Sequence, residues 1–463
     1  MGTMTLAFLS LLPIATVAIF LVLLRWPASR AMPLTYAVAT VLALFVWQVP
    51  GMQVVAATIN GIVVALTLLY IIFGAILLLN TLQESGAISA IRQGFTDVSS
   101  DRRVQVIIVA WLFGSFIEGS AGFGTPAAVA VPLLVGLGFP GMAAVMSGMI
   151  IQSTPVSFGA LGTPILVGVN TGLSADPAIA EYAASLGYAQ WNDFLGFIAF
   201  RVALLHAIAG TLIPLILVSF LTRFFGKNKS FAEGLRVWPF AIFAAFSMTV
   251  PYLLAARFLG PEFPALAGSL VGLVIVVSAA RAGFLVPKAS DHWDFDDKST
   301  WPAEWTGSAV FKDNEGGPRM GLAMAWMPYV IVALLLLTSR AVPFFKSFLQ
   351  QSIRLTWDGI LGSNINMTTV EPLYLPGTLF IVASLIAVGM HGLSLQKYAR
   401  AWSTSLRVSA AASIALIFTV PMVQVFLNTS GGASGFDQMP IVLADGVASL
   451  AGGAWPIFSP FVG

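Results

Sequence analysis

The sequence contains a series of apolar stretches, each about as long as the hydrocarbon core of a lipid bilayer is thick. A helix that crosses a membrane needs roughly 20 mostly apolar residues. Stretches of about this length, with few charges, cover residues 6–24, 33–49, 54–79, 194–220, 237–256, 264–280, 321–339, 374–391 and 408–427. This pattern predicts an all-α polytopic membrane protein.

Composition excludes the soluble alternatives. Only 9% of the 463 residues are charged and 58% are hydrophobic, whereas soluble domains carry roughly 25% charged residues. The net charge of +2 does not favour a nucleic-acid partner. The absence of cysteine excludes disulfides, thiolate metal sites and a cysteine nucleophile. Arg25 and Arg30 follow the first apolar run instead of preceding it, so this run is predicted to be a retained span and not a cleaved signal peptide.

Three further apolar stretches are interrupted by helix breakers, namely 104–139, 142–173 and 441–463. We interpret 104–139 as a re-entrant hairpin that enters and leaves on one side, and 142–173 as one broken crossing. With this topology, most Lys and Arg residues lie in loops on one side, and the other side holds Arg257, Arg340, Lys346 and Arg354. The positive-inside rule then predicts an outside N-terminus. The prediction is about ten membrane-crossing segments, the re-entrant hairpin and an incomplete last segment.

The two breaks of residues 104–173 share a motif. The first runs from Gly114 to Pro126 (G-S-F-I-E-G-S-A-G-F-G-T-P) and the second from Gln152 to Pro164 (Q-S-T-P-V-S-F-G-A-L-G-T-P). Both end in Gly-Thr-Pro. Proline is favoured in the first turn of a helix, and a preceding threonine is a good N-cap. Each Gly-Thr-Pro therefore predicts the start of a half-helix at membrane depth, with its N-cap threonine.

Broken helices inside a bilayer indicate a transport site. Irregular backbone is tolerated there only when it is buried in protein or lines a watery cavity. Facing half-helix N-termini favour an anion, as in secondary transporters. The predicted ligand is a small carboxylate, and its predicted contacts are Gly122, Gly124, Thr125, Ser153, Thr154, Gly162, Thr163 and Arg201. The alternative is that the glycines only allow close helix packing.

Three ionisable residues at membrane depth are candidates for function. Glu118 either carries a coupling proton or pairs with Arg201. Arg201 either binds the substrate carboxylate in a bidentate way or forms a buried ion pair or snorkels. His206 is either a proton relay or a hydrogen-bonded packing residue, and five residues of separation place it about 140° from Arg201 around a helix. The acidic residues between 291 and 297 fit no metal loop. We predict no metal site and no cofactor, and the absence of a phosphate-loop motif argues against ATP-driven transport.

The sequence resembles a known family in its most distinctive motifs. Residues 116–139 (F-I-E-G-S-A-G-F-G-T-P-A-A-V-A-V-P-L-L-V-G-L-G-F) resemble the signature of the bacterial lactate permease family, and residues 153–164 (S-T-P-V-S-F-G-A-L-G-T-P) match it too. The resemblance implies a proton symporter in the bacterial inner membrane that imports L-lactate, D-lactate and glycolate. It also implies elevator-type transport, homo-oligomers and two inverted repeats. The repeats would be residues 1–220 and 221–463.

The end of the sequence resembles the entrance of a second hairpin. Residues 454–463 (A-W-P-I-F-S-P-F-V-G) compare with residues 110–119 (A-W-L-F-G-S-F-I-E-G) of the first hairpin. Members of the family continue further, so we expect this chain to lack its C-terminal end and the second repeat to be incomplete. The alternative function is a non-transporting fragment. An intramembrane hydrolase using Ser115 or Ser120 with His206 is disfavoured, because no Gly-x-Ser-x-Gly or His-Glu-x-x-His motif is present.

Overall fold

The computed structural model describes residues 2–454 except 97, 123–124, 175–176 and 307–319, and within them the fold is helical. An isolated antiparallel bridge between Leu355 and Val370 is the only β pairing in these residues. Eight helices of this part are long and apolar enough to cross a membrane, or nine if the bent pair Leu395–Ala411 and Ser413–Leu427 forms one span. The prediction of an all-α polytopic membrane protein is confirmed.

The chain forms two compact units. Unit 1 comprises Met1–Phe73, Ser339–Leu375 and Ser403–Gly463, and unit 2 comprises Gly74–Thr338 and Pro376–Trp402. The helical segments of unit 1, with η marking 3-10 and π-helical segments, are α1 (Thr3–Val17), η1 (Ala18–Leu23), α2 (Ala28–Val41), η2 (Leu42–Val46), the first part of α3 (Gly51–Glu84), α19 (Pro343–Gln351), η9 (Ile360–Gly362), the last part of α21 (Leu395–Leu427), α22 (Met439–Ala451) and η10 (Gly452–Ala454).

In unit 1, a buried pair of amide side chains holds the loop between α19 and Leu375, where this segment of the unit ends. The Asn60 amide on α3 donates to the Gln424 side-chain oxygen on α21 at 3.1 Å. The Asn60 carbonyl oxygen accepts the backbone N–H of Thr368 at 2.8 Å. Both side chains are buried, and a buried polar group is stable only when it is paired. The loop before α20 is therefore pinned to two helices by a satisfied polar network.

Unit 2 contains both breaks of the sequence. Its segments are the rest of α3, α4 (Ala87–Thr96), α5 (Arg102–Val106), η3 (Ile107–Phe113), α6 (Gly114–Ala121), α7 (Thr125–Gly136), α8 (Gly141–Ile150), η4 (Ile151–Ser153), η5 (Val156–Phe158), α9 (Gly159–Thr163), η6 (Pro164–Val169), α10 (Asn170–Ser174), α11 (Pro177–Ser185), α12 (Trp191–Gly210), α13 (Ile213–Phe225), α14 (Phe231–Leu235), α15 (Trp238–Phe258), α16 (Pro264–Arg281), η7 (Ala289–Asp291), η8 (Lys298–Thr300), α17 (Ala303–Thr306), most of α18 (Leu322–Ala341), α20 (Pro376–Met390) and the first part of α21.

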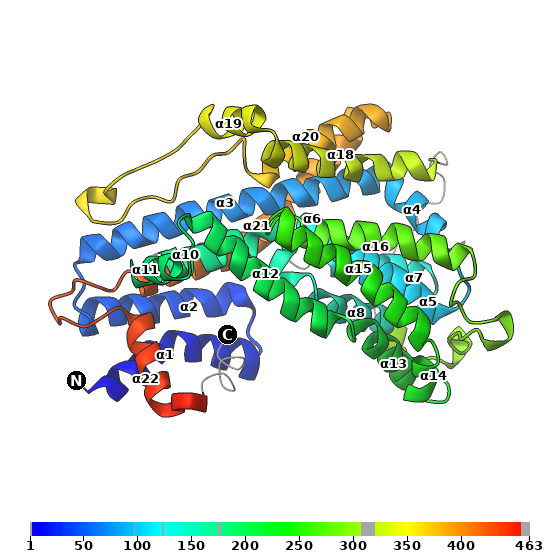
Figure 1. Ribbon diagram of the computed structural model, residues 1–463, viewed down its shortest axis with the longest axis horizontal. Helices are drawn as coiled ribbons and strands as arrows, with labels where there is room; N and C mark the ends of the chain where they lie inside the picture. The colour runs from blue at the N-terminus through cyan, green and yellow to red at the C-terminus, as the bar shows by residue number, and fades with distance from the viewer. Residues whose placement is uncertain (1, 97, 123–124, 175–176, 307–319, 455–463) are drawn as a thin grey trace. The chain divides into compact units, whose positions relative to one another are not determined.

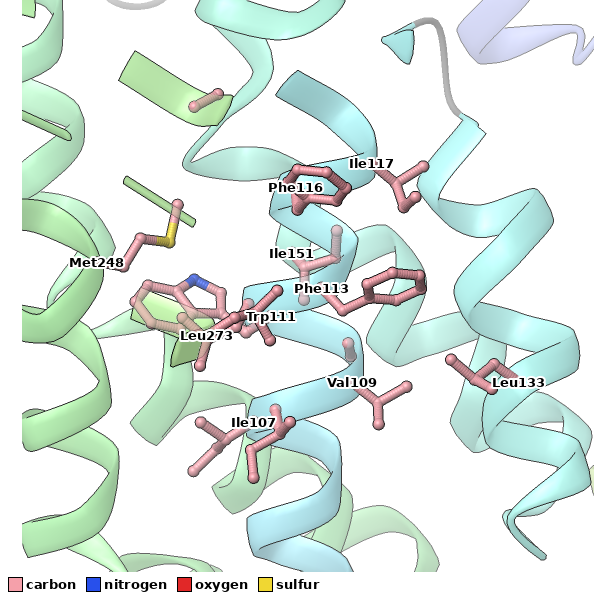
Figure 2. Close-up of a cluster of buried hydrophobic side chains, with 14 of the residues drawn as sticks. Ile107, Val109, Trp111, Phe113, Phe116, Ile117, Leu133, Ile151, Met248 and Leu273 are labelled. Carbon is pink, nitrogen blue, oxygen red and sulfur yellow. The ribbon is translucent and has the colours of Figure 1, made fainter. Parts of the chain in front are cut away.

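The core of unit 2 surrounds the helix that leads into the first break. All residues of η3 are buried, because this segment is apolar on every side and is enclosed by other helices. Figure 2 shows Trp111 against Met248 of α15 and Leu273 of α16. Helices α15 and α16 lie side by side (Figure 1). Their contact is close, since a Cβ on Gly268 would lie 2.6 Å from the Tyr252 Cβ. Glycine here lets the two helices approach and so encloses the helix of the first break.

A buried ion pair, here called the basal clasp, fixes the start of this helix. Asp101 caps α5 by accepting the Arg103 backbone N–H at 2.8 Å and also accepts the Arg103 guanidinium at 2.6 and 3.0 Å. The guanidinium also donates to the carbonyls of Glu233 and Asp291 at 2.6 and 2.8 Å. The backbone N–H of Trp293 donates to the Asp101 carboxylate at 3.2 Å. The basal clasp therefore ties the polar segment 288–301 to the start of α5.

The predicted span 194–220 lies within one candidate span, Trp191–Phe225. Within it, the hydrogen-bonding pattern changes between α12, which ends at Gly210, and α13, which begins at Ile213. Pro214 explains this change, because proline lacks the N–H that a continuing helix needs and suits a first turn. The predicted last segment, 441–463, corresponds to α22 and η10 over its first part, and residues 455–463 lie outside the described residues.

Candidate functional site

The first break turns the chain back on itself. Helix α6 ends at Ala121 and is followed by Gly122, whose φ of +63° is a conformation that favours glycine. Helix α7 then packs along α6 and η3. At the far end, the Arg102 guanidinium donates to the Leu137 carbonyl, so the two ends of the pair lie together and the break forms the tip. A re-entrant hairpin requires this geometry. Gly124 lies outside the described residues, and Thr125 begins α7.

The second break is an irregular turn with a left-handed backbone. Ala160, Leu161 and Gly162 have φ values of 42°, 58° and 73°. Such positions are sparsely populated for residues other than glycine, and they cluster at functional sites. A Cβ on Gly162 would collide with the carbonyl of Pro261. Only glycine therefore fits where the turn meets the loop after α15.

The expected N-cap at Thr163 is wrong. Thr163 has helical angles, φ −48° and ψ −41°, and its side chain makes no cap hydrogen bond. Its hydroxyl instead donates to the Ala160 carbonyl at 2.5 Å. The physical reason is the left-handed turn, which places this carbonyl within reach behind Thr163. The threonine thus stabilises the turn and does not cap the following helix.

The two breaks meet in space. A Cβ added to Gly122 would lie 2.7 Å from the Ala160 backbone nitrogen. A Cβ added to Gly159 would lie 2.6 Å from Oε1 of Glu118. These contacts join the tip of the hairpin to the middle of the second break. The Glu118 carboxyl therefore lies against the backbone of the second break, where a glycine leaves room for it.

Glu118 is buried, and no described residue forms an ion pair with it. Its residue is 3% exposed, and Oε2 has no hydrogen-bond partner in the described part of the protein. It lies in the candidate span Arg102–Ser120. On the same helix, the Trp111 Nε1–H and the Ser115 hydroxyl are also buried without a partner among the described residues. Buried polar groups are usually hydrogen-bonded to protein, water or a ligand. These three side chains are therefore able to form hydrogen bonds with water or with a bound ligand.

Arg201 lies apart from this carboxyl group. It is exposed on α12, with its guanidinium 5.0 Å from the centre of the Phe197 ring. Because Glu118 Oε2 lacks any hydrogen-bond partner in the described residues, the alternative in which Arg201 pairs with Glu118 is not supported. Stacking on an aromatic ring is a favourable arrangement for arginine. The direct binding of a carboxylate by Arg201 stays a prediction.

His206, one turn and a half further along α12, is bound to the second break. Its Nδ1 lies 2.6 Å from the Thr154 carbonyl oxygen and its Nε2 lies 3.1 Å from the Ser157 hydroxyl. The Tyr252 hydroxyl donates to the same Thr154 carbonyl at 3.2 Å. The rings of His206 and Tyr252 both meet Phe158 edge to face. The histidine is hydrogen-bonded, and its partners belong to the predicted site.

The remaining predicted residues occupy different environments. Ser153 is exposed and its hydroxyl donates to the Ile150 carbonyl at 2.8 Å. Thr154 is buried, and its hydroxyl lacks a partner in the described residues. All of these residues belong to unit 2. The structure thus brings together Glu118, Gly122 and the second break with His206.

Sequence reasoning missed three residues of this cluster. Ser157 and Gly159 lie inside the second motif, where their proximity to Gly-Thr-Pro was an available signal. Tyr252 lies in the middle of an apolar helix, and nothing in its neighbourhood along the chain indicates that it reaches the second break. It donates there only because α15 packs beside α12.

Comparison with known proteins decides the family. The family model described as L-lactate permease matches residues 6–463. The chain belongs to the L-lactate permease family. It is therefore a multi-pass membrane protein of a transporter family and not an enzyme. No solved structure matches the chain.

Individual members of the permease family align over most of this chain. The glycolate permease GlcA of Escherichia coli is 27% identical over 493 aligned residues, which cover 99% of this chain and 79% of GlcA. The L-lactate permease of Bacillus subtilis is 25% identical over 491 residues, with the same coverage of 99% and 79%. A relative from Haemophilus influenzae is 29% identical over 420 residues, or 88% of this chain and 71% of its own length.

Proposed function

We propose that this chain is a proton symporter that imports L-lactate and related 2-hydroxy monocarboxylates, including D-lactate and glycolate. Its relatives are named for lactate and glycolate. The two substrates share a carboxylate with a hydroxyl on the next carbon. The proposed location is the bacterial inner membrane with the N-terminus outside, as the distribution of basic loops predicts. We also propose that copies of this chain form homo-oligomers.

The observation that carries the proposal is the position of Glu118. An acidic side chain buried in a candidate span, without an ionic partner in the described residues, lies where two helix breaks meet. An unpaired charge at that depth is costly. A proton or a cationic partner removes this cost. Since no cationic side chain in the described part pairs with it, a transported proton is the proposed neutralising group.

Charge balance explains why a proton accompanies the substrate. A lactate anion that enters alone carries charge against the membrane potential, and each elementary charge is worth about 2.3 kcal/mol per 100 mV. One proton per lactate removes this term. The backbone of the two breaks offers donors for the carboxylate, with Gly122, Thr154, Gly162 and Thr163 proposed around it. Glu118 and His206 are the proposed proton carriers.

The test is uptake of radiolabelled L-lactate in cells that lack their own lactate carriers, with an inward proton gradient. We expect uptake above empty vector that collapses when a protonophore is added. Glu118→Gln keeps the size of the side chain but cannot release a proton. We expect it to lose proton-driven accumulation by at least about tenfold, while lactate exchange across the membrane without a gradient persists.

The matched control is Glu181→Gln, which changes an exposed acid on α11 and is expected to leave uptake unchanged. Absence of uptake despite verified membrane insertion would show that this chain does not transport lactate by itself, and the non-transporting fragment would take its place. Uptake that resists the protonophore would refute proton coupling and leave transport standing.

A further inference from the structure

The hydrogen bonds of His206 determine which of its nitrogens carries a proton. The Thr154 carbonyl can only accept, so Nδ1, at 2.6 Å, must donate its N–H to it. In the neutral ring Nε2 then has a lone pair and no hydrogen. The Ser157 hydroxyl, 3.1 Å away, must donate to Nε2. The single proton of Ser157 is thus directed to His206 and is not available to any other acceptor.

Protonation of His206 reverses this second hydrogen bond. The imidazolium carries hydrogen on both nitrogens, so Nδ1 keeps its bond to Thr154 and Nε2 donates to the Ser157 oxygen. The Ser157 hydroxyl hydrogen is released by this change. It can then donate to a different acceptor. No side chain has to move, because the same two atoms exchange the roles of donor and acceptor.

We propose that Ser157 binds the carboxylate of the substrate, and that its hydroxyl is free to do so only when His206 is protonated. This inference rests on the proposed function, because it assumes a carboxylate substrate. It adds a residue and a means of coupling, since arrival of the proton creates a donor for the anion. An anion bound to Ser157 in turn stabilises the positive charge on His206.

The position of Ser157 supports this role. It is half-buried in η5, between the buried Thr154 and Gly159. Gly159 lies against the Glu118 carboxyl. Thr154 is 1% exposed, and its hydroxyl, which lies toward Gly210 of α12, has no partner among the described residues. Ser157 therefore lies two residues from Gly159, at which the two breaks meet, and three residues from another buried hydroxyl.

Other charged and titratable groups lie on α12, on the elements packed against it and on α6. Tyr252 of α15 shares the Thr154 carbonyl with it. Arg257 of α15 lies over Phe200, 5.8 Å from the ring centre. The remaining groups on packed elements are Arg201 and Asp193 on α12 itself, Glu181 and Tyr182 on α11, Arg223 on α13, and Glu118 on α6. None of them is a hydrogen-bond partner of His206 among the described residues, because Nδ1 bonds to the Thr154 carbonyl and Nε2 bonds to the Ser157 hydroxyl.

The test measures equilibrium binding of radiolabelled L-lactate to the purified full chain at about pH 5.5 and about pH 8, without a gradient. We expect the unsubstituted protein, here called the parent, to bind lactate more tightly at the acidic pH. A hydrogen bond to a charged acceptor is worth about 1.5–3 kcal/mol, or about 10- to 100-fold in the dissociation constant. Ser157→Ala should lose this amount at the acidic pH and little at the basic pH, which reduces the pH dependence of binding by the same factor.

Two further variants separate binding from folding. Ser157→Thr retains a hydroxyl and should restore the pH dependence. Ser147→Ala removes a buried hydroxyl on α8 that donates to the Ala143 carbonyl, and binding should stay unchanged. If Ser157→Ala keeps the full pH dependence of the parent, the inference is wrong, although the proposed transport stands. If the parent itself does not bind lactate, the proposed function fails first.

Discussion

The basal clasp allows a quantitative prediction for the stability of unit 2. The change is Asp101→Ala, which removes the carboxylate and leaves the Arg103 guanidinium. Asp101 is 0% and Arg103 2% exposed, so the remaining charge stays away from water. The substitution also removes the N-cap side chain of α5. The guanidinium keeps its bonds to the carbonyls of Glu233 and Asp291, but it loses its counter-charge.

The magnitude follows from burial. Removing one partner of a buried ion pair costs about 3–5 kcal/mol, and the lost cap adds about 1 kcal/mol. We expect a loss of about 4–6 kcal/mol in the free energy of unfolding. For a large folding unit, each kcal/mol lowers the midpoint of thermal unfolding by about 2 °C. This midpoint should therefore fall by roughly 8–12 °C.

The assay is thermal unfolding in detergent followed by intrinsic tryptophan fluorescence, to which Trp293 of the clasp contributes. Asp294→Asn is the matched control, because the exposed Asp294 pairs with the half-buried Arg102 at 2.8 Å, and pairs that water reaches contribute about 0–1 kcal/mol. The double variant Asp101→Leu with Arg103→Met removes the unpaired charge and should recover part of the loss. A midpoint for Asp101→Ala within about 2 °C of the control would refute this reasoning.

Two further predictions concern the site and the topology. Gly159→Ala places a methyl group 2.6 Å from the carboxyl of the first break, and we expect lactate uptake to fall at least about tenfold. Gly168→Ala, which meets nothing within 4 Å, should retain uptake. The chain has no cysteine, so single cysteines report sidedness without background. An impermeant thiol reagent added to intact cells should label Ser352→Cys and not Lys229→Cys, and the reverse pattern contradicts an outside N-terminus.

The sequence predicted the class of fold and the two breaks because both leave local signals. Apolar stretches and Gly-Thr-Pro motifs are visible over a few residues. Glu118 was recognised for the same reason, since an acid in an apolar, glycine-rich run is unusual. The helical angle between Arg201 and His206 also agrees with the structure, where Arg201 is exposed and His206 turns toward Thr154.

Packing between distant segments explains what sequence reasoning missed. The contact of Gly159 with Glu118 joins residues that belong to different motifs, and no spacing rule relates them. Tyr252 reaches Thr154 from α15 for the same reason. The error at Thr163 has a different cause, because the capping rule assumes an extended residue before the helix, and the left-handed turn at Ala160 delivers Thr163 already in helical conformation.

The close contact between the two breaks has a mechanical consequence. A methyl group on Gly122 would lie 2.7 Å from the Ala160 backbone nitrogen, and one on Gly159 would lie 2.6 Å from the Glu118 carboxyl. The tip of the hairpin and the second break are therefore closely packed, and sliding one along the other would force Gly122 against the Ala160 backbone. In the proposed transport cycle, we therefore expect both halves of the site to move together. Access to the substrate from either side of the membrane would then depend on movements outside this closely packed pair.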